Sequence, residues 1–384
     1  MAIIDFTGHA SGLDANEYDG TSGTFSTPSA IKYDGSAGYV GMASPTTTAV
    51  GYGFLDSWGT DGTHVAANAP TLYISFWFKY SIKPTVGDEP ILRSQNSGGN
   101  QKFEVRIDSN GKLFGYNSAG TLVASGTTIL SANTWYRLDV KIGTSSTVGA
   151  YELKINGTTE WSGTTNTTGA NNYQLRVGKA VNRNGNTVTF YYDNIVLDDA
   201  GYQENIYSTL TLLPEANGST MSWTSGTGLS DYTQVYDIPP GDTTYVASAG
   251  GTANQIAYFA LSNRPSNIST NNVILAVKLI VRVRETTGTP TTAFVTRLVS
   301  GATTYSTAPK DMSGVVQPSG ILLTTDPNTG AAWTWAAIDA LQVGGIETTN
   351  NSMRITTVTV EVLYAPRILA SVQDSVSVID APTY

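Results

Sequence analysis

The chain of 384 residues contains no cysteine and only two histidines, His9 and His64. Without cysteine it can form no disulfide, cysteine nucleophile or cysteine-ligated zinc site. With two histidines, a Ser-His-Asp relay has few possible bases. His64 lies in a loop rich in Gly and Thr, and we interpret it as structural rather than catalytic.

Charge is also sparse, at 13% of residues, and the formal net charge is −9 with a pI near 4.7. Nucleic-acid binding requires a basic footprint, so we expect no nucleic-acid partner. The longest apolar stretch, residues 273–283, is interrupted by Lys278 and Arg282, which predicts no membrane insertion. Residues 1–6 lack the basic region and apolar run of a signal peptide, so we expect synthesis in the cytosol.

Gly, Thr, Ser and Asn make up much of the remainder, a composition that favours strands and turns over helices. The clearest strands lie between residues 135 and 199. Apolar and polar residues alternate strictly over 136–142 and 151–155, and residues 72–80 alternate in the same way. The side-chain period of a strand is two, so this pattern predicts an antiparallel sheet with one buried and one wet face.

Four segments in this region occur in a characteristic order. They are Trp135-Tyr136-Arg137-Leu138, Leu153-Lys154-Ile155-Asn156-Gly157, Leu175-Arg176-Val177-Gly178 and Tyr192-Asp193-Asn194-Ile195-Val196-Leu197. Their order and spacing resemble the concanavalin A-like, laminin-G-like jelly roll. The resemblance implies that residues 1–200 form such a sandwich, and a hairpin at 103–116, turning at Asn110-Gly111, fits it. An Asn-Gly pair favours a primed hairpin turn.

The remaining chain predicts a second β-sandwich over residues 201–366 and an extended arm over 367–384. The alternating row at 273–283 is typical of a central strand, and one short helix is expected at 331–341. The fold class is therefore all-β. The arm alternates apolar and polar residues without a turn that would return the chain. We expect it to pair with another molecule through Ile368, Val372, Val376 and Val378.

Catalysis is not expected. Some jelly rolls of this class hydrolyse glycosides with a Glu-x-Asp-x-x-Glu strand, a spacing that this sequence lacks. Paired carboxylates are the minimum for that chemistry. Glu104 and Asp108 come nearest, and we interpret them as part of a solvated strand face.

Calcium is a possible cofactor by the resemblance, because such jelly rolls often hold Ca²⁺ in rim loops through Asp, Asn and carbonyl oxygens. Asp56, Asp61 and Asp193 are the candidate ligands, with Asp198 and Asp199 also available. The alternative is structural, with carboxylates that cap loop amides.

Exposed aromatic rings can stack on sugars. Trp58, Trp161 and Tyr116 fall in predicted loops or turns and are the candidate glycan-binding residues. The competing interpretation is that these rings are buried in the core.

Taken over its whole length, the chain resembles bacteriophage virion structural proteins, such as decoration, fibre or tail-associated proteins. That implies a virion location, capsid or tail proteins as partners, and a homo-oligomer, with a trimer favoured. The protein would attach to surfaces or cell-surface glycans and dock through its arm. The alternative is a soluble bacterial carbohydrate-binding module, with calcium dependence possible.

Overall fold

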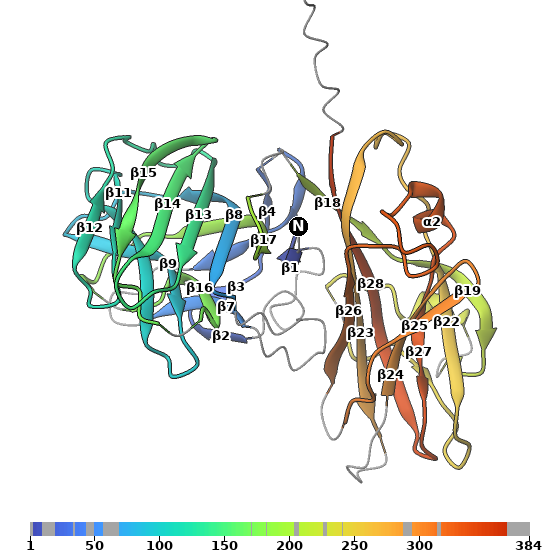
Figure 1. Ribbon diagram of the computed structural model, residues 1–384. Coiled ribbons are helices and arrows are strands. Elements are labelled where there is room, and N and C mark those ends of the chain that lie inside the picture. The colour runs from blue at the N-terminus through green and yellow to red at the C-terminus, as the bar shows by residue number, and fades with distance from the viewer. Residues whose placement is uncertain are drawn as a thin grey trace, which may run out of the picture.

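Two β-sandwiches lie side by side in the computed structural model (Figure 1). It describes residues 3–9, 20–33, 35–43, 50–56, 69–169, 171–181, 183–202, 207–225, 229–239, 241–286, 294–312 and 316–366. Almost all regular structure in these residues is strand, which confirms the all-β prediction. None of the described helices is long and apolar enough to span a membrane.

The first sandwich pairs a seven-stranded with an eight-stranded antiparallel sheet. The seven-stranded sheet has the order β12 (Leu122–Ser125), β11 (Leu113–Tyr116), β10 (Gln101–Asp108), β9 (Asp88–Gln95), β16 (Gln174–Lys179), β7 (Gly51–Asp56) and β2 (Gly20–Gly23). The eight-stranded sheet has the order β15 (Thr158–Thr165), β14 (Gly149–Ile155), β13 (Tyr136–Gly143), β8 (Thr71–Tyr80), β17 (Phe190–Asp198), β6 (Gly41–Ala43) and β3 (Phe25–Ser26), with β1 (Ile3–Thr7) also on β17. A small hairpin is formed by β4 (Ser29–Ile31) and β5 (Ala37–Tyr39).

The core between these sheets is formed by the apolar residues that alternate along the strands and point inward. Phe76 and Phe78 from β8 belong to the same core cluster as Phe103 and Val105 from β10, and all four are fully buried. The predicted strand at 72–80 is thus confirmed as a core strand. Burying side chains of this size stabilises the fold by roughly 1.5–3 kcal/mol each.

The second sandwich contains a six-stranded and a five-stranded sheet. The six-stranded sheet has the order β20 (Thr224–Ser225), β21 (Val246–Ala247), β28 (Met353–Ala365), β23 (Val273–Glu285) and β26 (Gln317–Leu323), with β18 (Ser208–Leu212) also on β28. The five-stranded sheet has the order β19 (Pro214–Met221), β22 (Gln255–Leu261), β27 (Gln342–Glu347), β24 (Phe294–Ser300) and β25 (Thr303–Ser306). The predicted central strand is β23, flanked by β28 and β26.

Two local predictions need correction. In the 103–116 hairpin the amide of Gly111 donates to the carbonyl of Asp108, so Ser109 and Asn110 are the central residues of the turn. Only Gly111 has a positive φ, of 84°, whereas a primed turn requires a positive φ at the first central residue or at both. The Asp108 carboxylate accepts hydrogen bonds from the amides of Asn110 and Lys112, and these bonds favour an unprimed turn. The predicted helix is short: α2 (Trp335–Asp339) begins after its N-cap Thr334, and a 3-10 turn, η1 (Asp231–Gln234), lies elsewhere.

The first strand of the chain lies between the sandwiches. In Figure 1, β1 and β18 sit where the sheet of β23, β26 and β28 faces the first sandwich. Phe6 is fully buried there among Val196, Tyr207 and Leu363. The Lys278 ammonium lies 3.0 Å from the Asp5 carboxylate, and both side chains are buried. The interface therefore combines an apolar cluster with a buried ion pair.

This interface overturns the prediction of a wet face on β13. Arg137 and Asp139 occupy that face, yet they are 8% and 1% exposed. The carboxylate of Asp139 accepts from Arg137 at 2.9 Å and from the Ser75 hydroxyl at 2.6 Å. The guanidinium of Arg137 lies 5.7 Å from the ring centroid of Tyr207, which precedes β18. Sequence alternation identified the polar face correctly but could not show that Tyr207 covers it.

Candidate functional site

One row of side chains crosses five strands of the seven-stranded sheet. Tyr116 on β11 pairs with Glu104 on β10, which pairs with Arg93 on β9. Arg93 pairs with Arg176 on β16, which pairs with Phe54 on β7. Directly opposite residues share a face, and the residues adjacent to them point into the core, so this row lies on the outer face. Four strand spacings make the row about 20 Å long.

A groove of about 680 Å³ lies at the Tyr116 end of this row. Its lining residues are Gly87, Asp88, Asp108, Ser109, Phe114, Tyr116, Leu122, Arg183 and Asn184. Ligand sites commonly have volumes of roughly 300–1,000 Å³. The groove and the row share Tyr116, and Arg183 of the groove contacts Glu104 of the row. Together they form the candidate site.

Tyr116 is fixed by two neighbours. Its hydroxyl donates to the Asp88 carboxylate at 2.5 Å, and the guanidinium of Arg106 lies 3.4 Å from its ring centroid. Burial, followed by the hydrogen bond to Asp88, raises the pKa of Tyr116 to about 12. The ring is therefore neutral and pre-oriented, with one face covered by Arg106.

Glu104 binds two arginines. Its Oε1 lies 3.1 Å from Nε of Arg106 and 3.6 Å from Nε of Arg183. Glu104 is fully buried and Arg106 is 3% exposed, so the predicted solvated face of β10 was wrong. The face is buried because the arginines cover the carboxylate and pair with it.

Arg93 and Arg176 have no carboxylate partner among the described residues. Nε of Arg93 is buried without a hydrogen-bond acceptor there. Burial lowers the pKa of Arg93; Glu104 raises it, and Arg176, Arg183 and Arg106 lower it further. Nε of Arg176 donates to Gln174 at 2.6 Å, and its guanidinium lies 4.5 Å from the ring centroid of Tyr52. The centre of the row is thus a group of mutually repelling arginines. Tyr116 lies at one end of the row, and Phe54, with Tyr52 beside it, lies at the other.

The predicted glycan-binding residues have different fates. Tyr116 lies in the groove, though on a strand rather than in a loop. Trp161 lies on β15 and is 8% exposed, packed against Phe103 and Tyr151, and its indole N–H donates to the carbonyl of Leu113. The predicted loop position and sugar-stacking role of Trp161 were wrong, because β15 turns this side chain into the core. Trp58 lies outside the described residues.

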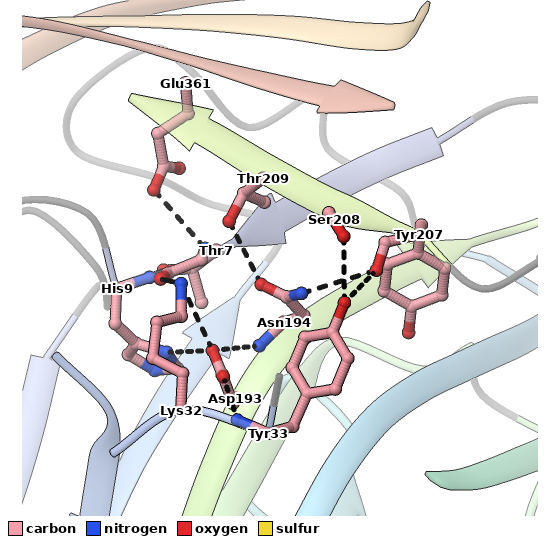
Figure 2. A network of polar contacts seen from close by, with 11 residues as sticks. Thr7, His9, Lys32, Tyr33, Asp193, Asn194, Tyr207, Ser208, Thr209 and Glu361 are labelled. Carbon is pink, nitrogen blue, oxygen red and sulfur yellow. Dashed lines mark hydrogen bonds and ion pairs between the residues drawn. The ribbon is translucent and has the colours of Figure 1, made fainter. Parts of the chain in front are cut away.

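Asp193 lies in the network that joins the sandwiches (Figure 2). Its carboxylate accepts from the amides of Tyr33, at 3.2 Å, and Asn194, at 2.9 Å. Nζ of Lys32 and Nδ1 of His9 lie 3.7 and 3.9 Å from it. This is the geometry of a carboxylate that caps loop amides, the structural alternative to calcium binding.

The other metal candidates do not converge here. Among the described residues, no group of three or more His, Asp and Glu side chains could hold a metal ion. The Asp198 carboxylate accepts from the amides of Ala200 and Gly201. Asp61 and the side chain of Asp56 lie outside what the structure describes, as do the arm residues Ile368, Val372, Val376 and Val378.

Sequence reasoning did not identify Arg93 or Arg176 as site residues. Arg176 stands in a short alternating segment, which places it on an outer face, but Arg93 follows two consecutive core residues, Ile91 and Leu92, and has no such pattern. Only the pairing of β9 with β16, which are about 80 residues apart in the chain, brings them together. The site is a property of strand order, which one sequence does not reveal.

No known protein family matches the sequence, and no curated protein matches it significantly. Among solved structures, the chain is similar to the cellulose induced protein Cip1, with 13% identity over 51% of this chain and 97% of that one, at a TM-score of 0.40. A Trypanosoma rangeli sialidase in complex with sialic acid is 12% identical over 49% of this chain and 30% of its own, at a TM-score of 0.34. The alginate lyase AlgAT5 from polysaccharide lyase family 7 is 13% identical over 46% of this chain and 70% of its own, at a TM-score of 0.27. The match spans less than a third of that sialidase, and likenesses at this level transfer no activity, ligand or site to this chain.

Proposed function

We propose that this protein is a non-catalytic glycan-binding protein that attaches through the outer face of its seven-stranded sheet. The observation that carries the proposal is the row from Tyr116 to Phe54 with the groove at its end. Aromatic rings at both ends and hydrogen-bonding side chains between them suit an extended saccharide. The row is long enough for several sugar rings.

Binding rather than cleavage is favoured by the state of the carboxylates. Glu104 is engaged by Arg106 and Arg183, and Asp88 by Arg106 and Tyr116. Glycoside hydrolysis needs one carboxyl group as an acid and a second as a nucleophile or base. Asp108 accepts from the amides of Asn110 and Lys112. Because these three carboxylates already orient neighbouring groups, we expect no new reducing ends when the protein is incubated with a polysaccharide that it binds. Release of reducing ends would contradict the non-catalytic assignment.

The direct test is a glycan array probed with the full chain and with Tyr116→Ala. A matched control is Tyr305→Ala, which removes a 41% exposed tyrosine from the second sandwich. We expect the wild-type protein and the control to bind the same glycans, and Tyr116→Ala to lose them. If the wild-type protein binds no glycan, or Tyr116→Ala binds as well as the control, the proposal fails.

We further propose that the protein presents this face from a bacteriophage particle, with residues 367–384 as its docking arm. The ground for this proposal is the sequence of the arm, which alternates apolar and polar residues and follows β28 in the chain. Light scattering on the full chain and on a chain ending at Pro366 tests the arm. A multimer that becomes a monomer on truncation supports it, and a truncated chain that stays multimeric contradicts it. A soluble carbohydrate-binding module is the alternative, and it predicts a monomer for the full chain.

A further inference from the structure

The candidate face reverses the charge of the rest of the protein. The chain carries 21 Lys and Arg against 30 Asp and Glu. Around the row and its groove, however, four arginines gather with three carboxylates. The arginines are Arg93, Arg106, Arg176 and Arg183, and the carboxylates are Glu104, Asp88 and Asp108. A local positive excess on an acidic protein concentrates anions at this face.

The three carboxylates do not pair with all four arginines. Glu104 and Asp88 contact Arg106, and Glu104 also lies close to Arg183. Asp108 accepts hydrogen bonds from the amides of Asn110 and Lys112. Arg93 and Arg176 are left without a carboxylate in the described structure, although each is only partly exposed. They are direct cross-strand partners, so their side chains leave the sheet side by side. A partly desolvated pair of like charges is unfavourable unless an anion lies between them.

We propose that Arg93 and Arg176 bind the acidic group of an anionic glycan, a carboxylate or sulfate ester, while the flanking aromatic residues contact its sugar rings. This inference rests on the proposed function and specifies its ligand. Guanidinium groups bind such oxyanions through paired hydrogen bonds. Glu104 acts as a positioning residue, since it holds Arg106 and Arg183 at the edge of the same site.

The test is calorimetric titration of the full chain with oligogalacturonate and with the same oligomer after its carboxyl groups are reduced to alcohols. Dextran sulfate and dextran form a second matched pair that tests sulfate. We expect an acidic oligomer to bind at least about tenfold more tightly than its neutral counterpart, because hydrogen bonds between charged groups are worth more than neutral ones. The pair that shows the difference identifies the oxyanion.

Variants locate the effect. We expect Arg93→Gln with Arg176→Gln to abolish the preference for the acidic oligomer. The matched control is Arg284→Gln with Arg354→Gln, which removes a cross-strand arginine pair from β23 and β28 and should change affinity less than about twofold. If the glutamine double variant fails to fold, Arg93→Lys with Arg176→Lys takes its place, because it keeps both charges. This variant should bind the acidic oligomer more weakly than the wild type, because lysine cannot form paired hydrogen bonds to an oxyanion.

The outcomes are distinguishable. Equal affinity for acidic and neutral oligomers overturns the charge inference and leaves glycan binding intact. Failure to bind any glycan overturns both. Equal weakening by the control pair shows that net charge, not this site, attracts the anion, and overturns the inference. Tighter binding of a single-stranded oligothymidylate than of the acidic oligomers also overturns it, since the ligand would then be a nucleic acid.

Discussion

Arg106 covers one face of the Tyr116 ring, with its guanidinium carbon 3.4 Å from the ring centroid. Both side chains also contact the Asp88 carboxylate, Tyr116 at 2.5 Å and Arg106 at 3.3 Å. The three groups form a closed triangle that fixes the ring at the edge of the groove. Several consequences of this arrangement, and of others in the protein, can be measured.

The first prediction concerns the hydroxyl of Tyr116. Its pKa is about 12, whereas a free tyrosine has a pKa of about 10. The folded state therefore holds this proton more tightly, and the resulting stability is complete below pH 10 and lost as the pH rises toward 12. We expect Tyr116→Phe to lower the free energy of unfolding by about 1–2 kcal/mol at pH 7, with the difference shrinking above pH 10. Urea titrations at several pH values measure this, and Tyr305→Phe serves as the control; a difference that grows above pH 10 would contradict it.

The second prediction concerns Lys102, a fully buried lysine on β10. Its ammonium donates to the carbonyl of Thr168 at 3.1 Å, and burial lowers its pKa to about 8. The unfolded chain binds this proton more tightly, so the protein loses stability as the pH falls from about 10.5 to 8. We expect Lys102→Met to be more stable than the wild type at pH 7 and to lose this advantage by pH 10.5. Exposed Lys83→Met should show no such trend; a parallel trend in that control would refute the assignment.

The third prediction concerns Trp161, which packs in the core against Phe103 and Tyr151. Trp161→Ala should lower the free energy of unfolding by about 3–5 kcal/mol, because it leaves a cavity and removes one of the two hydrogen bonds to the Leu113 carbonyl, which still accepts from the amide of Gly126. Trp161→Phe should cost less. Neither variant should weaken glycan binding at temperatures where it remains folded. Loss of binding by a folded Trp161→Phe protein would restore the sugar-contacting role that the structure argues against.

The fourth prediction concerns the ion pair between the sandwiches. Lys278→Met leaves the Asp5 carboxylate in a buried setting without its ammonium partner, and breaking such a pair costs about 3–5 kcal/mol. Calorimetry should then resolve separate melting of the two sandwiches. The control is Asp242→Asn, which breaks the 3.6 Å contact with Arg282 at a carboxylate that is 53% exposed, and should cost less than about 1 kcal/mol. A single unchanged transition in Lys278→Met would show that the ion pair does not couple the domains.

Features of the fold that depend on residues within one segment could be predicted from the sequence, and features that depend on residues far apart in the chain could not. Strands 71–80 and 273–285 were predictable because apolar and polar residues alternate within each segment. The burial of Arg137 and Asp139 was not, because Tyr207, which packs over Arg137, lies about 70 residues later in the chain. Trp161 shows the same limit: its neighbours Phe103 and Tyr151 come from two other strands, so its direction depends on how the sheets stack. The candidate site was hidden for this reason, since its arginines come from separate strands.

The network of Figure 2 includes a contact between the beginning and the end of the folded chain. The amide of Gly8 donates to the carboxylate of Glu361, 353 residues later, and any side chain at Gly8 would clash with Thr209. On a ribosome, the interval between these residues is roughly 20 to 70 s. During that interval β1 lacks its partner strand β17 until residue 198 has been made. Phe6 remains uncovered by the second sandwich until that sandwich is complete. The nascent chain therefore exposes the apolar face of β1 for much of its synthesis. Two copies made on the same messenger RNA could exchange their β1 strands during this time.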